Sequence, residues 1–433
     1  MPDLGYGDAS NDKKGELVMN EDMHSAMSEA TRLTVAGRLT EATALIQRRL
    51  DNSRKSDLSL PGPQLVENLR QANTRPSTTY PLAEPTIRPR REQEAGDIAA
   101  PGLLRRVAAA GLRSSALERC LTSTSPTPPD LESAAAEVGG LFVTASYTNV
   151  YGTRGYKLYV PSGYTGHAVP LIIMLHGGTQ SAVDFAAGTR MNEFAERNTF
   201  LVAYPEQPAS ANAARCWNWF QAANQDRAAG EPSLIAGITR KIMSDFEVDA
   251  RRVYVAGFSA GGAMAMIMAS TYADLYAAVG VHSGLAYGAA HDLPSAFAAM
   301  KQGKPHRALA TSDVIPLIVF HGDGDHVVDR VNADCILDDW SRAASNNQHK
   351  PASQKREPRV ERGQVVSGRE YTRFSFHDGV GKPSMELWIV HDAGHAWSGG
   401  SSAGSYTDPQ GPDASAQLVR FFAEHPKEKP VGA

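Results

Sequence analysis

The feature that most constrains the fold is an alternation of short β-rich runs and helical stretches that begins near residue 138. Strands that alternate with helices predict a largely parallel sheet with helices on both faces. Continuous apolar runs such as PLIIML and PLIVF are typical of the central strands of such a sheet, because both of their faces are buried. The sequence therefore predicts an α/β domain over residues 136–427, of a size that one core can serve.

The first third of the chain has a different composition. Residues 1–25 are polar, and we expect them to be disordered. Residues 26–50 repeat apolar side chains near helical spacing and predict a small amphipathic helical extension. Residues 51–135 are rich in Pro, Ser, Thr and Arg, which is the composition of a linker. Packing on the α/β domain is the favoured interpretation of the helical segment, and partner binding is the alternative.

Charge and cysteine content exclude several classes of protein. The formal net charge is −4 and no long basic stripe occurs, so nucleic-acid binding is not expected. No apolar stretch is long enough for a transmembrane segment, and the N-terminus has no apolar core of a secretory signal. We therefore expect a cytoplasmic location, with secretion as the less favoured alternative. Cys120, Cys216 and Cys335 show no metal-ligand spacing; reduced thiols are the simplest interpretation, and one disulfide remains open.

The strongest local motif is the G-x-S-x-G pattern Gly257-Phe258-Ser259-Ala260-Gly261. The pattern is weak by itself, but here it follows a strand pattern and opens a helical one. A sharp strand-to-helix turn exposes the serine hydroxyl at the carboxyl edge of the sheet, and the flanking glycines remove Cβ atoms that would clash. The alternative, a glycine-rich turn without chemistry, fits both flanks less well. Ser259 is therefore the predicted nucleophile.

A serine nucleophile needs a histidine base and an acid that orients the base. After a G-x-S-x-G turn, the acid and then the base follow later in the chain. One later strand ends before Asp323 and Asp325, and another before His391 and His395. Asp325 is the predicted acid, with Asp323 as its rival, and His395, in a glycine-flanked loop, is the predicted base. His391 ends its strand and is assigned a structural role.

A developing oxyanion needs two backbone N–H donors. The first is predicted to come from Ala260, directly after the nucleophile. The second is predicted from the loop His176-Gly177-Gly178-Thr179-Gln180, which follows an earlier central strand. Gly178 is the first candidate for this donor and Thr179 the second.

Six segments together resemble the polyhydroxybutyrate (PHB) depolymerase family of esterases, which is related to carbohydrate esterase family 1: LIIMLHGGTQ, CWNWF, RRVYVAGFSAGGAMA, VGVHSG, FHGDGDHVV and GHAWSGG. The resemblance covers roughly residues 140–425, with the motifs in order. It implies an α/β-hydrolase fold, a mainly parallel sheet flanked by helices, with the triad Ser259, Asp325 and His395. In such families the acid is the Asp of an HGxxDxxV pattern, which is Asp325 here.

The resemblance also implies an acyl-enzyme mechanism on an ester or polyester, with no cofactor and no metal. Secreted members carry a signal peptide and a polymer-binding module, and neither is visible in this sequence. We therefore expect an enzyme of the cytoplasm that acts on amorphous granules or soluble esters, and a granule contact through the N-terminal segment. A feruloyl or acetylxylan esterase is the alternative, and a scaffold that has kept the fold is a weaker one.

Four residues are candidates for contacts with substrate. Trp217 lies in the irregular CWNWF stretch, and Trp397 follows the predicted base. A small core beneath a loop is an equal alternative for Trp217. Gln180 lies in the oxyanion loop, and His282 ends a strand, where a structural role is also open. Residues 285–313 interrupt the strand–helix pattern and predict a lid or rim over the site.

Overall fold

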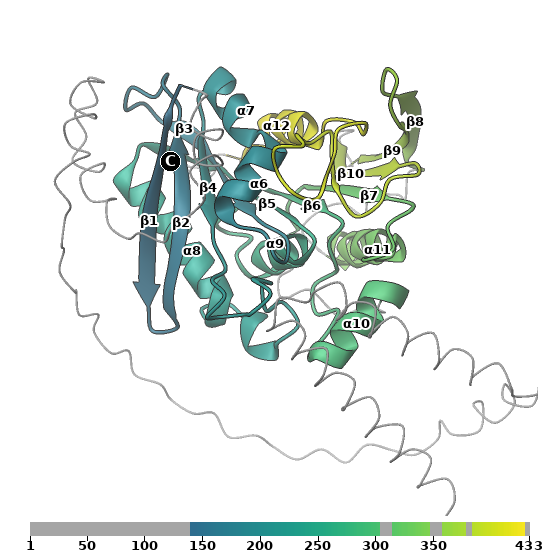
Figure 1. Cartoon of the computed structure of the whole chain (residues 1–433), viewed down its shortest axis with the longest axis horizontal. Helices are drawn as coiled ribbons and strands as arrows, with labels where there is room; N and C mark the ends of the chain where they lie inside the picture. The colour runs from purple at the N-terminus through teal and green to yellow at the C-terminus, as the bar shows by residue number, and fades with distance from the viewer. Residues whose placement is uncertain (1–138, 304–313, 347–356, 378–382, 429–433) are drawn as a thin grey trace, which may run out of the picture. The chain divides into compact units, whose positions relative to one another are not determined.

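A computed structural model of the chain describes residues 139–303, 314–346, 357–377 and 383–428. The predictions for residues 1–135 lie outside these ranges. Within them, no helix is long and apolar enough to cross a bilayer. They contain one large sheet with helices on both faces, as Figure 1 shows.

The sheet has ten strands and is parallel in its centre. β4, β3, β5, β6, β7 and β10 run parallel, whereas β1 and β2 at one edge and β9 and β8 at the other are antiparallel to their neighbours. This arrangement confirms the predicted mainly parallel sheet. In spatial order the strands are β1 (Leu141–Asn149), β2 (Gly152–Val160), β4 (Leu201–Pro205), β3 (Val169–Leu175), β5 (Val248–Phe258), β6 (Ala278–His282), β7 (Leu317–Gly322), β10 (Pro383–Val390), β9 (Glu370–His377) and β8 (Arg359–Gln364).

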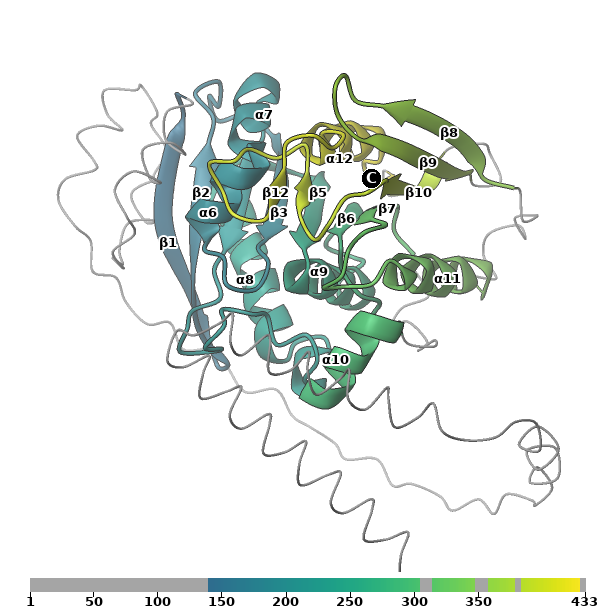
Figure 2. The same cartoon turned by 45° about the vertical axis from the view of Figure 1, so that its right-hand side comes forward.

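Helices cover both faces of the sheet (Figures 1 and 2). They bury apolar side chains against each face. One face carries α6 (Ala182–Thr189), α7 (Met191–Asn198) and α12 (Ala414–Glu424), and the other carries α8 (Gly230–Asp245), α9 (Ala260–Thr271), α10 (Leu293–Gln302) and α11 (Val331–Asn346). The stretch DFAAGTRMNEFAERN forms two helices rather than one, because Arg190 takes a left-handed conformation (φ 54°) that ends the first. The predicted lid contains α10, and its residues 304–313 lie outside the described ranges.

The antiparallel pair β8–β9 extends the sheet beyond β10, at the end that Figure 2 brings forward. We did not predict these strands. β8 reads RVERGQ, which lacks an apolar alternation, and none of its residues is fully buried. It forms a strand by pairing with β9 rather than by contributing to the core, so its hydrophobic pattern carries little signal.

The carboxyl ends of the parallel strands bring the predicted site loops to one edge of the sheet. Leu175 of β3 pairs with Gly257 of β5, so the loop after β3 lies beside the serine turn. Gly322 of β7 pairs with Val390 of β10, so the two loops with the Asp and His candidates also start side by side. A two-stranded sheet, β11 (Trp397–Ser398) and β12 (Thr407–Asp408), follows the histidine loop.

Candidate active site

Ser259 is held in a strained backbone conformation between β5 and α9. Its φ of 55° and ψ of −118° lie in a region that side chains other than glycine rarely adopt. The conformation is fixed from both sides. The Ser259 N–H donates to the His282 carbonyl oxygen at 2.9 Å, and the Ser259 carbonyl oxygen accepts from the N–H of Ala263 at 2.9 Å. Ser259 is half-buried rather than fully buried.

The two glycines of the motif allow the turn to approach the β3 loop closely. A Cβ on Gly261 would collide with the carbonyl oxygens of Leu175 and His176, and one on Gly257 would collide with the backbone of Gly261. Backbone atoms cannot move aside as a flexible side chain can. The motif therefore serves packing as well as exposure of the serine.

Ser259, His395 and Asp325 form a continuous chain of hydrogen bonds. His395 Nδ1 lies 2.7 Å from Asp325 Oδ2, and His395 Nε2 lies 2.9 Å from Ser259 Oγ. A carboxylate only accepts, so His395 carries its proton on Nδ1 and offers the Nε2 lone pair to the serine hydroxyl. The structure thus brings together the three residues predicted from the sequence.

Asp325 is anchored as well as buried. Its Oδ1 accepts the N–H groups of Val327 and Val328, each at 2.9 Å, which leaves Oδ2 for His395. Burial alone would raise the pKa of Asp325, but the hydrogen bond and charge interaction with His395, with help from His321 and the Val328 N–H, lower it below its usual value. The carboxylate is therefore ionised and fixed toward the histidine.

The rival candidates pair with each other. His391 Nδ1 lies 2.7 Å from Asp323 Oδ2, and His391 Nε2 lies 2.9 Å from the Thr372 hydroxyl. The side chains of this pair are more than one third exposed, whereas that of Asp325 is fully buried. Asp323 and His391 belong to the loop starts, and neither contacts Ser259.

In the loop after β3, the N–H of Gly178 is left for an oxyanion. The N–H of Gly177 donates to Gln180 Oε1 at 2.9 Å, and that of Thr179 donates to the Ala214 carbonyl oxygen at 2.6 Å. Gly178 N–H has no acceptor among the described residues. The prediction of Thr179 as a donor is therefore wrong, because Ala214 already occupies its N–H. Gly178 and Ala260, at the start of α9, remain the candidate donors.

Both predicted tryptophans are buried. Trp217 is fully buried beneath the β3 loop, where its indole N–H donates to the His176 carbonyl oxygen at 3.1 Å. Trp397 is 2% exposed, stacks on His282, and donates to the Ser415 hydroxyl at 3.1 Å. Both assignments to substrate contact are corrected: these side chains support the loops from inside the core.

The remaining two candidates are also structural. Gln180 is buried; its Oε1 accepts from Gly177, and its amide donates to Asp184 Oδ2 and to the Ser405 carbonyl oxygen. His282 is buried, and its Nε2 accepts the N–H of Ser398 at 2.9 Å. The side-chain polar atoms of both residues already have hydrogen-bond partners within the protein, so neither side chain is free to bind a substrate.

Tyr406 is a further residue near the site, and no sequence pattern predicts it. It is 47% exposed, its hydroxyl lies 3.1 Å from Thr179 Oγ1, and its ring lies 6.4 Å from that of Phe258, directly before Ser259. It reaches this place because the strand pair β11–β12 folds its loop back toward the β3 loop. No local motif marks the SSAGSYTDPQ stretch, so only the fold reveals it.

His282 makes stability sensitive to acid. Burial, with smaller contributions from His321 and His395, lowers its pKa to about 3, against about 6.5 in an unfolded chain. As the pH falls from about 6.5 to about 3, only the unfolded state takes up this proton, so the free energy of unfolding falls. We expect His282→Gln, whose amide oxygen can accept from Ser398, to reduce this slope by up to about 1.4 kcal/mol per pH unit.

Urea unfolding of both proteins at pH 4.5, 5.5, 6.5 and 7.5 measures that slope. The same slope in wild type and variant would contradict a buried neutral His282.

Within the described ranges, no group of three or more His, Cys, Asp and Glu side chains could hold a metal ion.

Comparison with known proteins shows the fold and indicates the family. The sequence model described as Esterase PHB depolymerase matches residues 154–362. Poly(3-hydroxyalkanoate) depolymerase C of Paucimonas lemoignei is 29% identical over 305 residues, which cover 68% of this chain and 70% of the depolymerase. Among solved structures, an acetyl xylan esterase from Aspergillus awamori has a TM-score of 0.50 at 18% identity, over 65% of this chain and 99% of its own. At that identity the likeness shows the α/β-hydrolase fold alone.

Two further relatives match over shorter stretches. Feruloyl esterase B of Neurospora crassa is 35% identical over 27% of this chain and 39% of its own length. Acetylxylan esterase A of Emericella nidulans is 33% identical over 31% of this chain and 43% of its own. The chain thus spans less than half of either of these esterases. The family match, the depolymerase relative and the shared fold together support a PHB depolymerase-family esterase.

Proposed function

We propose that the chain is a serine carboxylesterase that cleaves polyhydroxybutyrate or short-chain hydroxyalkanoate esters through an acyl-enzyme. The observation that carries the proposal is the hydrogen-bond chain from Asp325 through His395 to Ser259, at 2.7 and 2.9 Å. Nucleophile, base and orienting acid are within hydrogen-bond reach in the order that acyl transfer needs. The proposed oxyanion donors, Gly178 and Ala260, belong to loops that pack against each other.

The proposed reaction has two halves. Ser259 Oγ attacks the ester carbonyl carbon while His395 Nε2 takes the hydroxyl proton, and the carbonyl oxygen becomes an oxyanion held by N–H donors. The C–O bond then breaks, and the leaving alcohol takes the proton from His395. In the second half, water gives a proton to His395 and attacks the acyl-enzyme, and Ser259 leaves with that proton as the acid product forms. Asp325 stabilises the imidazolium in both halves.

The polyester class is favoured by the extent of the similarity. The match with the depolymerase covers 68% of the chain, against 27% for the feruloyl and 31% for the acetylxylan esterase. A hydroxycinnamate or acetyl ester is the second candidate.

Parallel assays with matched ester concentrations separate these candidates. We expect amorphous polyhydroxybutyrate and 3-hydroxybutyrate oligomers to be cleaved with kcat/KM at least about 10-fold above ethyl ferulate and acetylated xylan, a difference of about 1.4 kcal/mol in transition-state binding. Titration of released acid measures all four substrates on one scale. Preference for ethyl ferulate or acetylated xylan would overturn the polyester assignment and leave the esterase in place.

A further inference from the structure

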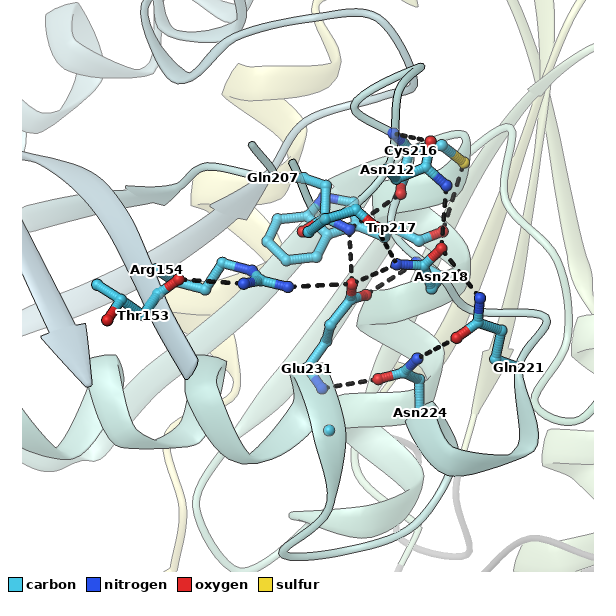
Figure 3. Close-up of polar contacts among 12 residues, drawn as sticks. Thr153, Arg154, Gln207, Asn212, Cys216, Trp217, Asn218, Gln221, Asn224 and Glu231 are labelled. Atoms are coloured by element: carbon cyan, nitrogen blue, oxygen red, sulfur yellow. Dashed lines mark hydrogen bonds and ion pairs between the residues drawn. The ribbon is translucent and has the colours of Figure 1, made fainter. Parts of the chain in front are cut away.

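A buried acidic side chain lies away from the reacting groups. Glu231, in the first turn of α8, is 3% exposed, and its carboxylate accepts four hydrogen bonds (Figure 3). Oε1 accepts from Arg154 Nη2 at 3.3 Å, Gln207 Nε2 at 2.5 Å and Asn218 Nδ2 at 2.7 Å, and Oε2 accepts from Asn218 N at 2.8 Å. A buried charge is costly unless it is paired in this way, so the cluster has a strict geometry.

We propose that Glu231 is a positioning residue for the oxyanion hole, and that it acts through Gln207 and His176 on the peptide that carries the Gly178 N–H. The inference rests on the proposed esterase function. Glu231 touches neither Ser259 nor His395 in the structure, so it is not itself a catalytic residue.

The first link is Gln207, which is fully buried. Its amide nitrogen donates to Glu231 Oε1 and to the Cys216 carbonyl oxygen, at 2.5 and 3.1 Å. Both partners only accept, so the amide has one possible orientation. Its backbone N–H donates to His176 Nε2 at 3.0 Å. Glu231 thus fixes the residue that binds the histidine.

The second link is the segment of Trp217 and Asn218, which Figure 3 shows beside Gln207. Glu231 holds Asn218 by both its backbone N–H and its side-chain amide. The neighbouring Trp217 donates its indole N–H to the His176 carbonyl oxygen at 3.1 Å. The same carboxylate therefore supports His176 from two directions.

The third link is His176 itself, which is fully buried. Burial lowers the pKa of its imidazole, and because Nε2 accepts a backbone N–H, the single proton lies on Nδ1. Nδ1 then donates to the Gly177 carbonyl oxygen at 2.7 Å. In a planar trans peptide the C=O and the following N–H point in opposite directions. Holding the Gly177 carbonyl toward His176 therefore turns the Gly178 N–H away from it.

A purely structural role for the cluster is the competing interpretation, and Glu386 provides a matched control for it. Glu386 is fully buried in β10 and accepts from Arg373, Arg420 and the indole of Trp388, at distances of 2.6 to 3.2 Å. It has no link to the β3 loop in the described residues. Glu386→Gln should thus lower stability as Glu231→Gln does, without altering the oxyanion donor.

The test compares Glu231→Gln and Glu386→Gln in the full chain. In Glu231→Gln, an NH2 group replaces one of the two acceptor oxygens and faces an N–H donor of a neighbouring residue. At least one hydrogen bond of the cluster is therefore lost, and His176 is held less firmly. Loss of a whole oxyanion donor lowers kcat by about 100- to 1,000-fold. A displaced Gly178 N–H in Glu231→Gln should therefore lower kcat by ~10- to 100-fold and leave KM within about 2-fold of wild type. We measure kcat and KM with p-nitrophenyl butyrate, and Ki for a trifluoromethyl ketone, whose serine adduct places an oxyanion in the hole.

The inference is supported if Ki of the ketone rises by the same factor as kcat/KM falls in Glu231→Gln, while Glu386→Gln keeps kcat within about 2-fold. It is overturned if both variants lose activity equally, or if Ki is unchanged. An inactive wild type, or an active Ser259→Ala protein, would instead refute the proposed function. Should Glu231→Gln fail to fold, Gln207→Met cuts the same relay at similar volume and must show the same loss of kcat.

Discussion

Ser259→Ala is expected to lower kcat for p-nitrophenyl butyrate by about 10⁶-fold, the loss seen when a serine hydrolase loses its nucleophile. No other described hydroxyl lies within hydrogen-bond reach of His395 Nε2, which contacts Ser259 Oγ at 2.9 Å. Activity that remains should be at the level supported by binding and the oxyanion donors alone. A fluorophosphonate probe, which bonds to activated serines, should label wild type and fail to label the variant.

Thermal unfolding of the same two preparations supplies the control, because a change of a half-buried hydroxyl to hydrogen should leave the fold intact. An Ala variant that folds and keeps more than about 1% of the wild-type kcat would remove Ser259 from the mechanism. Labelling of the variant at another residue would locate the true nucleophile.

Asp325→Asn is expected to lower kcat by about 10⁴-fold. The variant keeps the shape of the side chain, and its oxygen can still accept the N–H groups of Val327 and Val328. Its amide then donates toward His395 Nδ1, which stabilises the tautomer with the proton on Nε2. That tautomer cannot accept the proton of Ser259. Steady-state kinetics with p-nitrophenyl butyrate measure the effect.

Asp323→Asn is the matched comparison, two residues away and also paired with a histidine. Asp323 is solvent-exposed and binds His391 and the N–H of Asp392, so we expect kcat within about 3-fold of wild type. Equal losses in the two Asn variants would mean that both loops act as one structural unit. A larger loss in Asp323→Asn would exchange the roles of the two carboxylates.

The fold and the three central residues could be predicted because their signals are local. A buried parallel strand reads as an apolar run, and each of Ser259, Asp325 and His395 follows such a run on the next loop. Residue type and chain order then restrict the chemistry. The edge strand β8 could not be predicted in this way, because it contributes almost no apolar surface.

The rest of the site depends on contacts between distant segments. Gly178 and Thr179 are both candidates in sequence, and the contact that excludes Thr179 is with the Ala214 carbonyl oxygen, 35 residues later. Trp217 and Trp397 lie close to the predicted site residues in the sequence. Whether each side chain faces the substrate or the core is decided by packing. The Glu231 cluster draws on three further segments, at Arg154, Gln207 and Asn218, and has no motif at all.

At Ser259, activity and stability favour different residues, because the left-handed backbone favours glycine and the reaction needs a hydroxyl. A non-glycine residue held there costs on the order of 1–3 kcal/mol, a large share of the margin by which domains stay folded. Glycine would relieve that cost and remove the hydroxyl at the same step. A laboratory evolution experiment that selects only for heat resistance would therefore be expected to favour glycine at position 259. The resulting protein would be more stable and inactive.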